Sequence, residues 1–289
     1  MPCTLRYNKV QFMSTQNALL TILVEKINND TLVLPTLPAI ALKVRKSADD
    51  PNINLNGMAE VVGQDPSLSA RMIKISNSAY LGRQVKVQSV TQAVTRIGLA
   101  QVKNIATALA MEQLFVSKNE VVKKYMSMKW NDTIEIVANA LAALMTYQKE
   151  TGNKNLALDT MTLCALVANI GALPVLTEAE RHDSVFANPT FLDVAIDKLA
   201  GRIGGSIMRE WQFNDVFITC AEYWRELAFG KEDVSYIDFV RLGAALAKQV
   251  DNPEDYLNAA QAKGIFEDVD VYQTDEFIEM RDNAKTIFA

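Results

Sequence analysis

Residues 64–111 read QDPSLSARMIKISNSAYLGRQVKVQSVTQAVTRIGLAQVKNIATALAM, and the fold follows from this stretch. Its pattern predicts short helices joined by tight turns. Asp65 followed by Pro66 predicts a helix start, because the aspartate accepts a hydrogen bond from a free amide and proline needs no helical partner at the first position. The segment Ser89–Gln92 predicts a capping box at a second helix. Gly98 then predicts the end of that helix.

Between Pro66 and Met111 the sequence has no aspartate or glutamate, whereas the whole chain is acidic, with 29 Lys and Arg against 34 Asp and Glu. The six cations of this interval, called the basic island below, are Arg71, Lys74, Arg83, Lys86, Arg96 and Lys103. The island is either a solvated face whose charges pair with acids elsewhere, or a surface for an acidic protein or a phosphorylated ligand. The candidate binding residues are Arg71, Lys74, Asn77, Tyr80, Arg83 and Lys86.

Four motifs follow one another in the sequence: Leu34–Pro38, Asp65–Leu68, Ile75–Gly82 and Ala93–Gly98. In order and spacing they resemble the HDOD domain, a helical bacterial module related to HD phosphohydrolases. The resemblance extends more weakly to about residue 250. It implies a two-lobed helical fold whose second lobe is an HD-like bundle, and a regulatory role in a bacterial signalling pathway.

The periodicity of the apolar residues separately predicts an all-α protein, because no segment shows the alternation of a half-buried strand. We expect an N-terminal helical lobe over residues 14–118, an HD-like helical lobe over 119–250 and a C-terminal helical extension over 251–289. Besides the helix that begins at Ser89, helices are expected over residues 14–28, 37–48, 54–63, 66–77, 99–115, 125–149, 159–173, 190–211, 215–229, 235–250, 253–263 and 274–288.

The composition is that of an ordinary globular protein, with 289 residues, 49% hydrophobic and 22% charged. Its cysteines, Cys3, Cys164 and Cys220, are odd in number and widely spaced, which favours reduced thiols over a disulfide framework. The longest apolar runs fall short of the ~20 residues of a membrane span. We therefore expect a cytoplasmic protein without a membrane segment.

An HD phosphohydrolase holds its metal ions with histidine and aspartate ligands, yet this chain has one histidine. The resemblance places Asp132, Ala200 and Glu222 where relatives carry a histidine. It places Ala168 and Asn169 where they carry the His-Asp pair. Because alanine cannot coordinate a metal, the resemblance implies a degenerate site at these five positions.

Two further metal interpretations were weighed. His182 and Asp183 form a His-Asp dipeptide, but it lies in a charged loop out of register with the expected pair, so we expect no ligand there. Asp132, Glu222 and Asp238 would suit an oxygen-only magnesium site, although solvated surface charge is the simpler interpretation in an acidic chain.

The sequence thus predicts a non-catalytic regulatory protein of the HDOD type, without metal or cofactor, that binds a protein partner or a small phosphorylated ligand such as a nucleotide. The alternative is a metal-dependent phosphohydrolase, which the fold relationship suggests. Nucleic-acid binding is the least favoured class. Proteins that bind single strands place several aromatic residues among basic ones, and the basic island contains one, Tyr80.

Overall fold

The computed structural model describes residues 20–29, 31–77, 85–181, 189–230, 232–286 and 288. Within these ranges the chain is helical or irregular and has no strand, which confirms the all-α prediction. The α-helices are α2 (Ala39–Ala48), α3 (Leu55–Gly63), α4 (Pro66–Ser76), α5 (Val90–Ile97), α6 (Leu99–Ala110), α7 (Glu120–Thr151), α8 (Leu158–Val167), α9 (Ala172–Arg181), α11 (Pro189–Glu210), α12 (Asp215–Tyr223), α13 (Tyr236–Leu246), α14 (Pro253–Ala262) and α15 (Asp275–Lys285), and residues 20–28 form one more.

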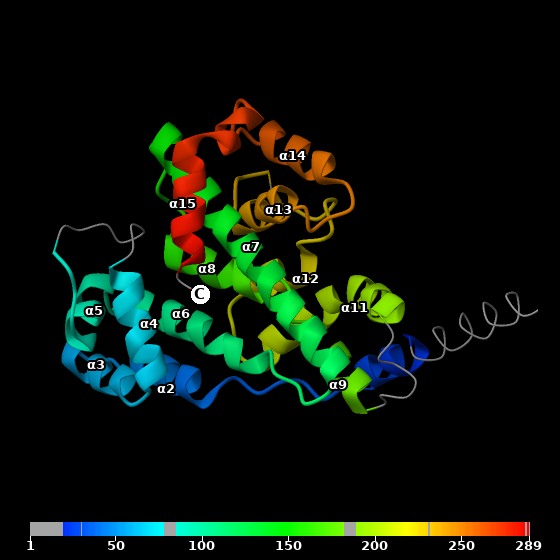
Figure 1. Cartoon of the computed structure of the whole chain (residues 1–289), viewed down its shortest axis with the longest axis horizontal. Helices are drawn as coiled ribbons and strands as arrows, with labels where there is room; N and C mark the ends of the chain where they lie inside the picture. The colour runs from blue at the N-terminus through cyan, green and yellow to red at the C-terminus, as the bar shows by residue number, and fades with distance from the viewer. Residues whose placement is uncertain are drawn as a thin grey trace, which may run out of the picture.

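Helices α2 to α6 pack on one another as a first lobe, shown in blue to cyan-green in Figure 1. The predicted caps are present: Asp65 accepts the Leu68 amide at 2.8 Å, and Ser89 accepts the Gln92 amide at 3.2 Å. The capping box differs in one bond, because the Gln92 side chain accepts from the amide of Gln88 instead of Ser89. Helix α5 still begins at Val90 with Ser89 as its cap, as predicted, and the Gln92 side chain binds the amide that precedes the cap.

Gly98 ends α5 with a φ of 92°, a conformation that glycine adopts without a steric penalty. The next helix is shorter than predicted: α6 ends at Ala110 and continues as a 3-10 turn over Met111–Leu114. Tightening of the last helical turn is common because it satisfies carbonyls that the α-helix leaves free.

The long helix α7 crosses the middle of the molecule and organises the second lobe (Figure 1). Helices α8, α13 and α15 pack along it. It begins at Glu120 and not near residue 125, because Asn119 caps it by accepting the amides of Val121 and Val122 at 3.0 Å. The asparagine cap lengthens the helix that the apolar pattern alone predicted.

The predicted helix over 159–173 is wrong as a single element. Helix α8 ends at Val167, residues 168–171 form a turn, and α9 starts at Ala172. The stretch Leu158–Arg181 has the length and hydropathy of a membrane span, but 89% of its apolar window is buried inside the protein. High hydropathy together with burial is typical of a core helix of a globular protein. The turn at residues 168–171 lies at the centre of the candidate site.

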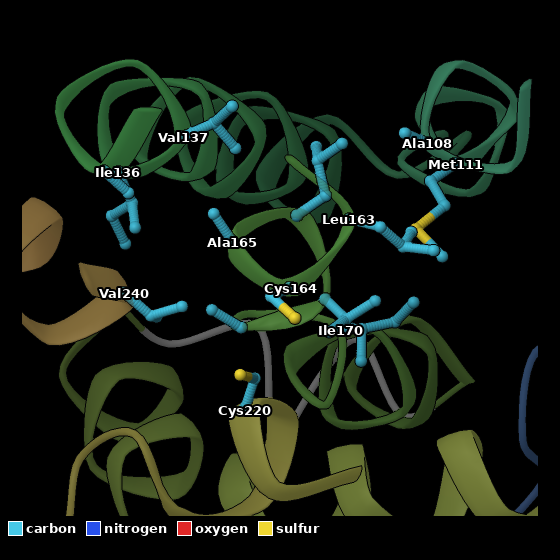
Figure 2. Packing of buried hydrophobic residues seen from close by; sticks show 14 of the residues in the cluster. Ala108, Met111, Ile136, Val137, Leu163, Cys164, Ala165, Ile170, Cys220 and Val240 are labelled. Carbon is cyan, nitrogen blue, oxygen red and sulfur yellow. The ribbon is translucent and has the colours of Figure 1, made fainter. Parts of the chain in front are cut away.

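Helices α7, α8, α12 and α13 all contribute residues to the part of the core in Figure 2. Ile136 and Val240 lie there with less than 1% of their surface exposed. Cys164 on α8 and Cys220 on α12 are free and buried, as predicted, and Figure 2 shows their sulfur atoms facing each other. Burial raises the pKa of the Cys164 thiol, so it stays protonated and unreactive. Cys3 lies outside the described residues.

The two lobes are joined by direct contacts. Helix α6 packs on α8, and Asn104 donates a hydrogen bond of 2.7 Å to Asp159. The helix over residues 20–28 lies beside α9, where Lys26 pairs with Glu178 (Figure 1). The chain then runs along one edge of the molecule to α2. The predicted limits of the lobes at residues 118 and 250 stay predictions, since the first helix contacts the second lobe.

The C-terminal residues pack on the second lobe. Helix α15 lies along α7, with Lys285 paired to Glu135 at 2.7 Å and the ring of Phe288 6.5 Å from that of Trp130. Helix α12 ends at Tyr223 and α13 at Leu246, each earlier than predicted. The residues after Tyr223 turn back toward α13, which matters for the site below.

Replacing Gly171 with alanine should strongly destabilise the fold. A Cβ atom there would lie 1.8 Å from the carbonyl oxygen of Ala200 and 2.6 Å from the amide nitrogen of Gly204. Because backbone cannot move as a side chain can, we expect a loss above the ~1–3 kcal/mol of ordinary overpacking, measured by urea unfolding. Gly63→Ala is the control, since nothing lies within 4 Å of its Cβ position. Equal stability of the two variants would contradict this packing.

Separating the lobes should leave residues 1–118 unable to fold alone. Leu23 and Ile27 are buried in a helix that pairs with α9, and α6 would lose its cover from α8. The exposed apolar faces should cause aggregation, seen by size-exclusion chromatography and calorimetry against the full chain. A monomeric fragment with a sharp melting transition would show that the first lobe is independent.

Candidate functional site

The four segments that the resemblance assigned to a degenerate metal site do converge. The 168–171 turn packs against α11 where Gly171 meets the carbonyl of Ala200. Helix α11 in turn packs closely on α12: a Cβ atom at Gly201 would lie 2.5 Å from the carbonyl oxygen of Glu222. The glycines of α11 therefore serve close helix packing. Helix α7 reaches the same point at Thr133.

The resemblance places Ala168 and Asn169 at the expected His-Asp pair, and in the structure they lie in the turn between α8 and α9. Both are buried, with 1% and 3% of their surface exposed. The Asn169 amide donates to the hydroxyl of Thr133 on α7 at 3.2 Å. The carbonyl of Ala168 accepts the indole N–H of Trp224 at 2.7 Å. The Ala168 side chain has no atom that can coordinate a metal ion. Both polar atoms of the Asn169 side chain are already in hydrogen bonds.

The other polar group at this point is Arg225, which the sequence analysis missed. Its Nη2 atom donates to the Asn169 side-chain oxygen at 2.8 Å. Its guanidinium carbon lies 4.0 Å from the centre of the Trp224 ring, a cation–π contact. We call Thr133, Ala168, Asn169, Trp224 and Arg225 the central cluster.

Arg225 is half-buried, and part of its guanidinium is enclosed by the protein. Its Nη1 atom is enclosed and has no hydrogen-bond partner among the residues that the structure describes. Burial lowers the pKa of Arg225 to about 10, and the carboxylate of Asp197 offsets part of this effect. The group therefore stays protonated at neutral pH. The hydroxyl of Tyr256 on α14 donates to the Arg225 carbonyl at 3.0 Å, which ties the C-terminal region to the cluster.

The three carboxylates weighed for a magnesium site are held by different cations. Asp132 pairs with Lys129 at 3.0 Å, one turn away on α7. Glu222 pairs with Arg209. Asp238 caps α13 and pairs with Lys263 at 2.7 Å. Across the described ranges, no three His, Cys, Asp or Glu side chains are placed to share a metal ion.

The residues at the centre do not fit the metal that an HD fold implies. Alanine at 168 and 200 has no ligand atom, and both oxygen and nitrogen of Asn169 are already in hydrogen bonds. A divalent ion would also lie beside the guanidinium of Arg225, and like charges at such distances disfavour each other. His182 lies outside the described residues.

Arg241 is more deeply buried than Arg225, and it holds the chain that follows the cluster. Its guanidinium donates to the carbonyl oxygens of Tyr223, Trp224, Glu226 and Phe229 at distances between 2.5 and 3.1 Å. These bonds fold residues 223–229 into a turn and stop α12 before the predicted residue 229. A single cation in the apolar helix Tyr236–Leu246 was a sequence signal for this role.

Cations of the basic island on the helices are engaged within the protein. Arg71 pairs with Glu112 and also donates to the Leu109 carbonyl at 3.4 Å. Lys103 pairs with Asp49. Arg96 donates to the carbonyl of Ser76 at 3.0 Å and to that of Val85. These contacts match the interpretation in which the cations pair with groups elsewhere.

The remaining candidate binding residues have mixed positions. The amide of Asn77 both donates to and accepts from the backbone of Val87, at 2.8 and 2.7 Å, so it holds the end of the loop together. Lys74 and Lys86 are exposed. Tyr80 and Arg83 lie outside the described residues.

The structure also has cavities that the sequence did not indicate. A groove of about 1220 Å³ lies between residues 32–37 and the end of α11, where the Trp211 indole donates to the Pro35 carbonyl at 2.9 Å. A smaller cavity of about 290 Å³ is lined by Arg71 together with apolar residues of the first lobe. The residues of the central cluster line neither cavity.

Comparison with known proteins identifies the family. A family model described as "HDOD domain" matches residues 34–227. A solved structure from Shewanella amazonensis SB2B, named "Putative metal-dependent phosphohydrolase", covers 96% of this chain and 100% of its own, with 38% identity and a TM-score of 0.91.

Two further proteins match this chain at lower sequence identity. A structure from Marinobacter aquaeolei VT8, named "Putative signal transduction protein", covers 90% of this chain and 60% of its own, with 20% identity and a TM-score of 0.61, which shows the fold alone. A Treponema pallidum (strain Nichols) protein, named "Uncharacterized protein", is 23% identical over 211 residues, and the match spans 69% of this chain but 39% of that protein. From the family match and the Shewanella structure, this chain belongs to the HDOD family, a helical family linked to signalling and related in fold to HD phosphohydrolases.

Proposed function

We propose that this protein is a non-catalytic regulator of a bacterial signalling pathway, located in the cytoplasm, that acts by binding a partner protein or a small anionic ligand. One observation carries the proposal. At the position of the His-Asp pair, Ala168 and Asn169 are buried, and Asn169 is bonded to Thr133 and Arg225. In this proposal the HD-like fold is kept, and hydrogen bonds of Asn169 to Thr133 and Arg225 stand where metal ligands would be.

A metal-dependent phosphohydrolase is the second candidate, because the Shewanella protein of similar fold is named as one. Fold alone does not establish an activity. Hydrolysis at phosphorus in this superfamily depends on a metal that polarises the phosphoryl group and lowers the pKa of water. The central cluster supplies a cation in place of the ligands for such a metal, so this candidate has less support.

Signalling is supported by the family and by the name of the Marinobacter protein, "Putative signal transduction protein". A regulator without catalysis must act through contacts with another molecule. Lys74 and Lys86 are exposed next to the loop that also contains Arg83. We therefore keep this loop as the proposed partner surface, while Arg71 and Lys103 serve mainly internal pairs.

The purified protein should contain no stoichiometric transition metal and should not hydrolyse phosphomonoesters, phosphodiesters or nucleotides. The reason is the loss of ligand atoms at residues 168, 169 and 200. Metal content is measured by mass spectrometry before and after incubation with Mn²⁺, Zn²⁺ or Mg²⁺, which separates absence of a site from loss during purification. A tightly held metal ion with turnover that Asp132→Ala abolishes would establish the phosphohydrolase instead.

The double charge reversal Arg83→Glu with Lys86→Glu should weaken partner binding and flatten its salt dependence. The melting temperature should barely change at Lys86, which is exposed, because exposed charges contribute ~0–1 kcal/mol each to stability, and we expect the same of position 83. Binding is measured as a salt series with a partner recovered from bacterial lysate on the wild-type protein. Lys123→Glu with Lys124→Glu, exposed on α7, is the matched control. Unchanged affinity in the first variant would exclude this loop.

A further inference from the structure

The centre of the second lobe has a positive charge even though the expected metal ligands are missing there. We propose that the guanidinium of Arg225 takes the place of the metal ion: it is the cation that links the turn after α12 to the 168–171 turn and, through Asn169, to α7. The inference rests on the proposed function, because it explains how an HD scaffold stays assembled without a metal. It predicts that chelators do not change the stability of the second lobe.

The geometry of the central cluster supports this role. Arg225 bonds to Asn169, the residue at the position of the signature aspartate, and Asn169 bonds to Thr133 on α7. Trp224 lies under the guanidinium and donates to the carbonyl of Ala168 in the same turn. A metal would connect these same three segments by accepting electron pairs from their side chains. The guanidinium connects the same segments by donating hydrogen bonds.

Arg241 shows what a purely structural buried arginine looks like in the same lobe. Four backbone carbonyls surround its guanidinium. Arg225 differs, because its side-chain partner is Asn169 and its Nη1 atom is enclosed without a partner in the described part of the chain. Such a group retains the capacity to hold a carboxylate, as a metal-loaded site would. Introducing an aspartate at position 169 therefore tests whether the guanidinium of Arg225 already supplies a positive charge to this site.

The test is a double-mutant cycle of Asn169→Asp and Arg225→Met, read as melting temperature between about pH 5 and pH 8. With Arg225 present, the introduced carboxylate has a cation. The Thr133 hydroxyl, which donates to the Lys129 carbonyl at 2.7 Å, can donate to the carboxylate only by giving up that bond. The guanidinium lowers the pKa of that carboxyl, so its stabilising effect is complete above the unfolded pKa of ~3.9 and is lost only in acid. We expect Asn169→Asp alone to melt within a few degrees of wild type, with no slope in this range.

Without Arg225 the introduced carboxyl is buried and unpaired, which raises its pKa. The variant protein is then most stable at low pH, where this carboxyl is protonated. It loses stability as the pH rises through the folded pKa of the carboxyl. The double variant should melt ~6–15 °C lower at pH 8 than Arg225→Met alone, with a smaller difference at pH 5. The nearby charged groups, Asp197 on α11, Tyr256 on α14 and the Lys129–Asp132 pair on α7, are the same in all four proteins.

Two controls separate charge from packing. Asn169→Asp combined with Arg281→Met, which removes a surface arginine, should behave like Asn169→Asp alone. If Arg225→Met does not fold, Arg225→Lys replaces it: lysine keeps the charge, so Asn169→Asp should again be tolerated. The single variant Asn169→Asp also decides the question alone. A melting temperature that falls with rising pH would show that no cation faces position 169 and would overturn the proposal.

Metal titration distinguishes this inference from the proposed function. If Mn²⁺ or Zn²⁺ raises the melting temperature of Asn169→Asp equally with and without Arg225, a metal supplies the charge and the inference fails. Metal binding and hydrolysis by the wild-type protein would instead refute the proposed function. A metal-free, inactive wild type whose cycle shows no coupling would overturn the role of Arg225 and leave the proposed function standing.

Discussion

The second lobe depends on the close approach of backbone to backbone at Gly171 and Gly201. There the 168–171 turn meets α11, and α11 meets α12, at distances that leave no room for a Cβ atom. This contact fixes where the turn after α8 lies relative to the residues after α12. Asn169 and Arg225, 56 positions apart in the chain, become hydrogen-bond partners because of it. A wider spacing would open the centre and leave both polar groups without partners, which is costly in a protein interior.

The polar groups at the centre show how the second lobe accommodates positive charge next to its core. A buried charge is tolerated when neutral acceptors and an aromatic face surround it. Arg241 is satisfied by carbonyl oxygens of the turn after α12, and Arg225 by Asn169 and the Trp224 ring. Tyr256 carries the network to α14, beyond residue 227 where the family match ends. The C-terminal helices are thus part of the same cooperative structure as the central cluster.

The basic island shows why a charge pattern along the chain does not define a surface. The interval between Pro66 and Met111 has no acid of its own, yet Arg71 meets Glu112 just beyond it, and Lys103 meets Asp49 before it. Packing of α2 and α4 against α6 brings these acids close. Field strength at a surface depends on neighbours in space within a Debye length of ~8–10 Å. The exposed part of the island is therefore smaller than the sequence suggested.

The sequence by itself determined the all-α class, the family and most helix starts, because caps such as Asn54, Asp65 and Ser89 act on amides within three residues. It also proposed which segments would form a degenerate site, and the structure brings the 168–171 turn, α7 and α11 together there. It did not locate the break at residues 168–171 or the end of α12, because contacts with distant residues set both. The role of Arg225 was decided by tertiary structure alone: nothing near it in the chain marks it as buried, and its charge matters only because packing places it on Asn169.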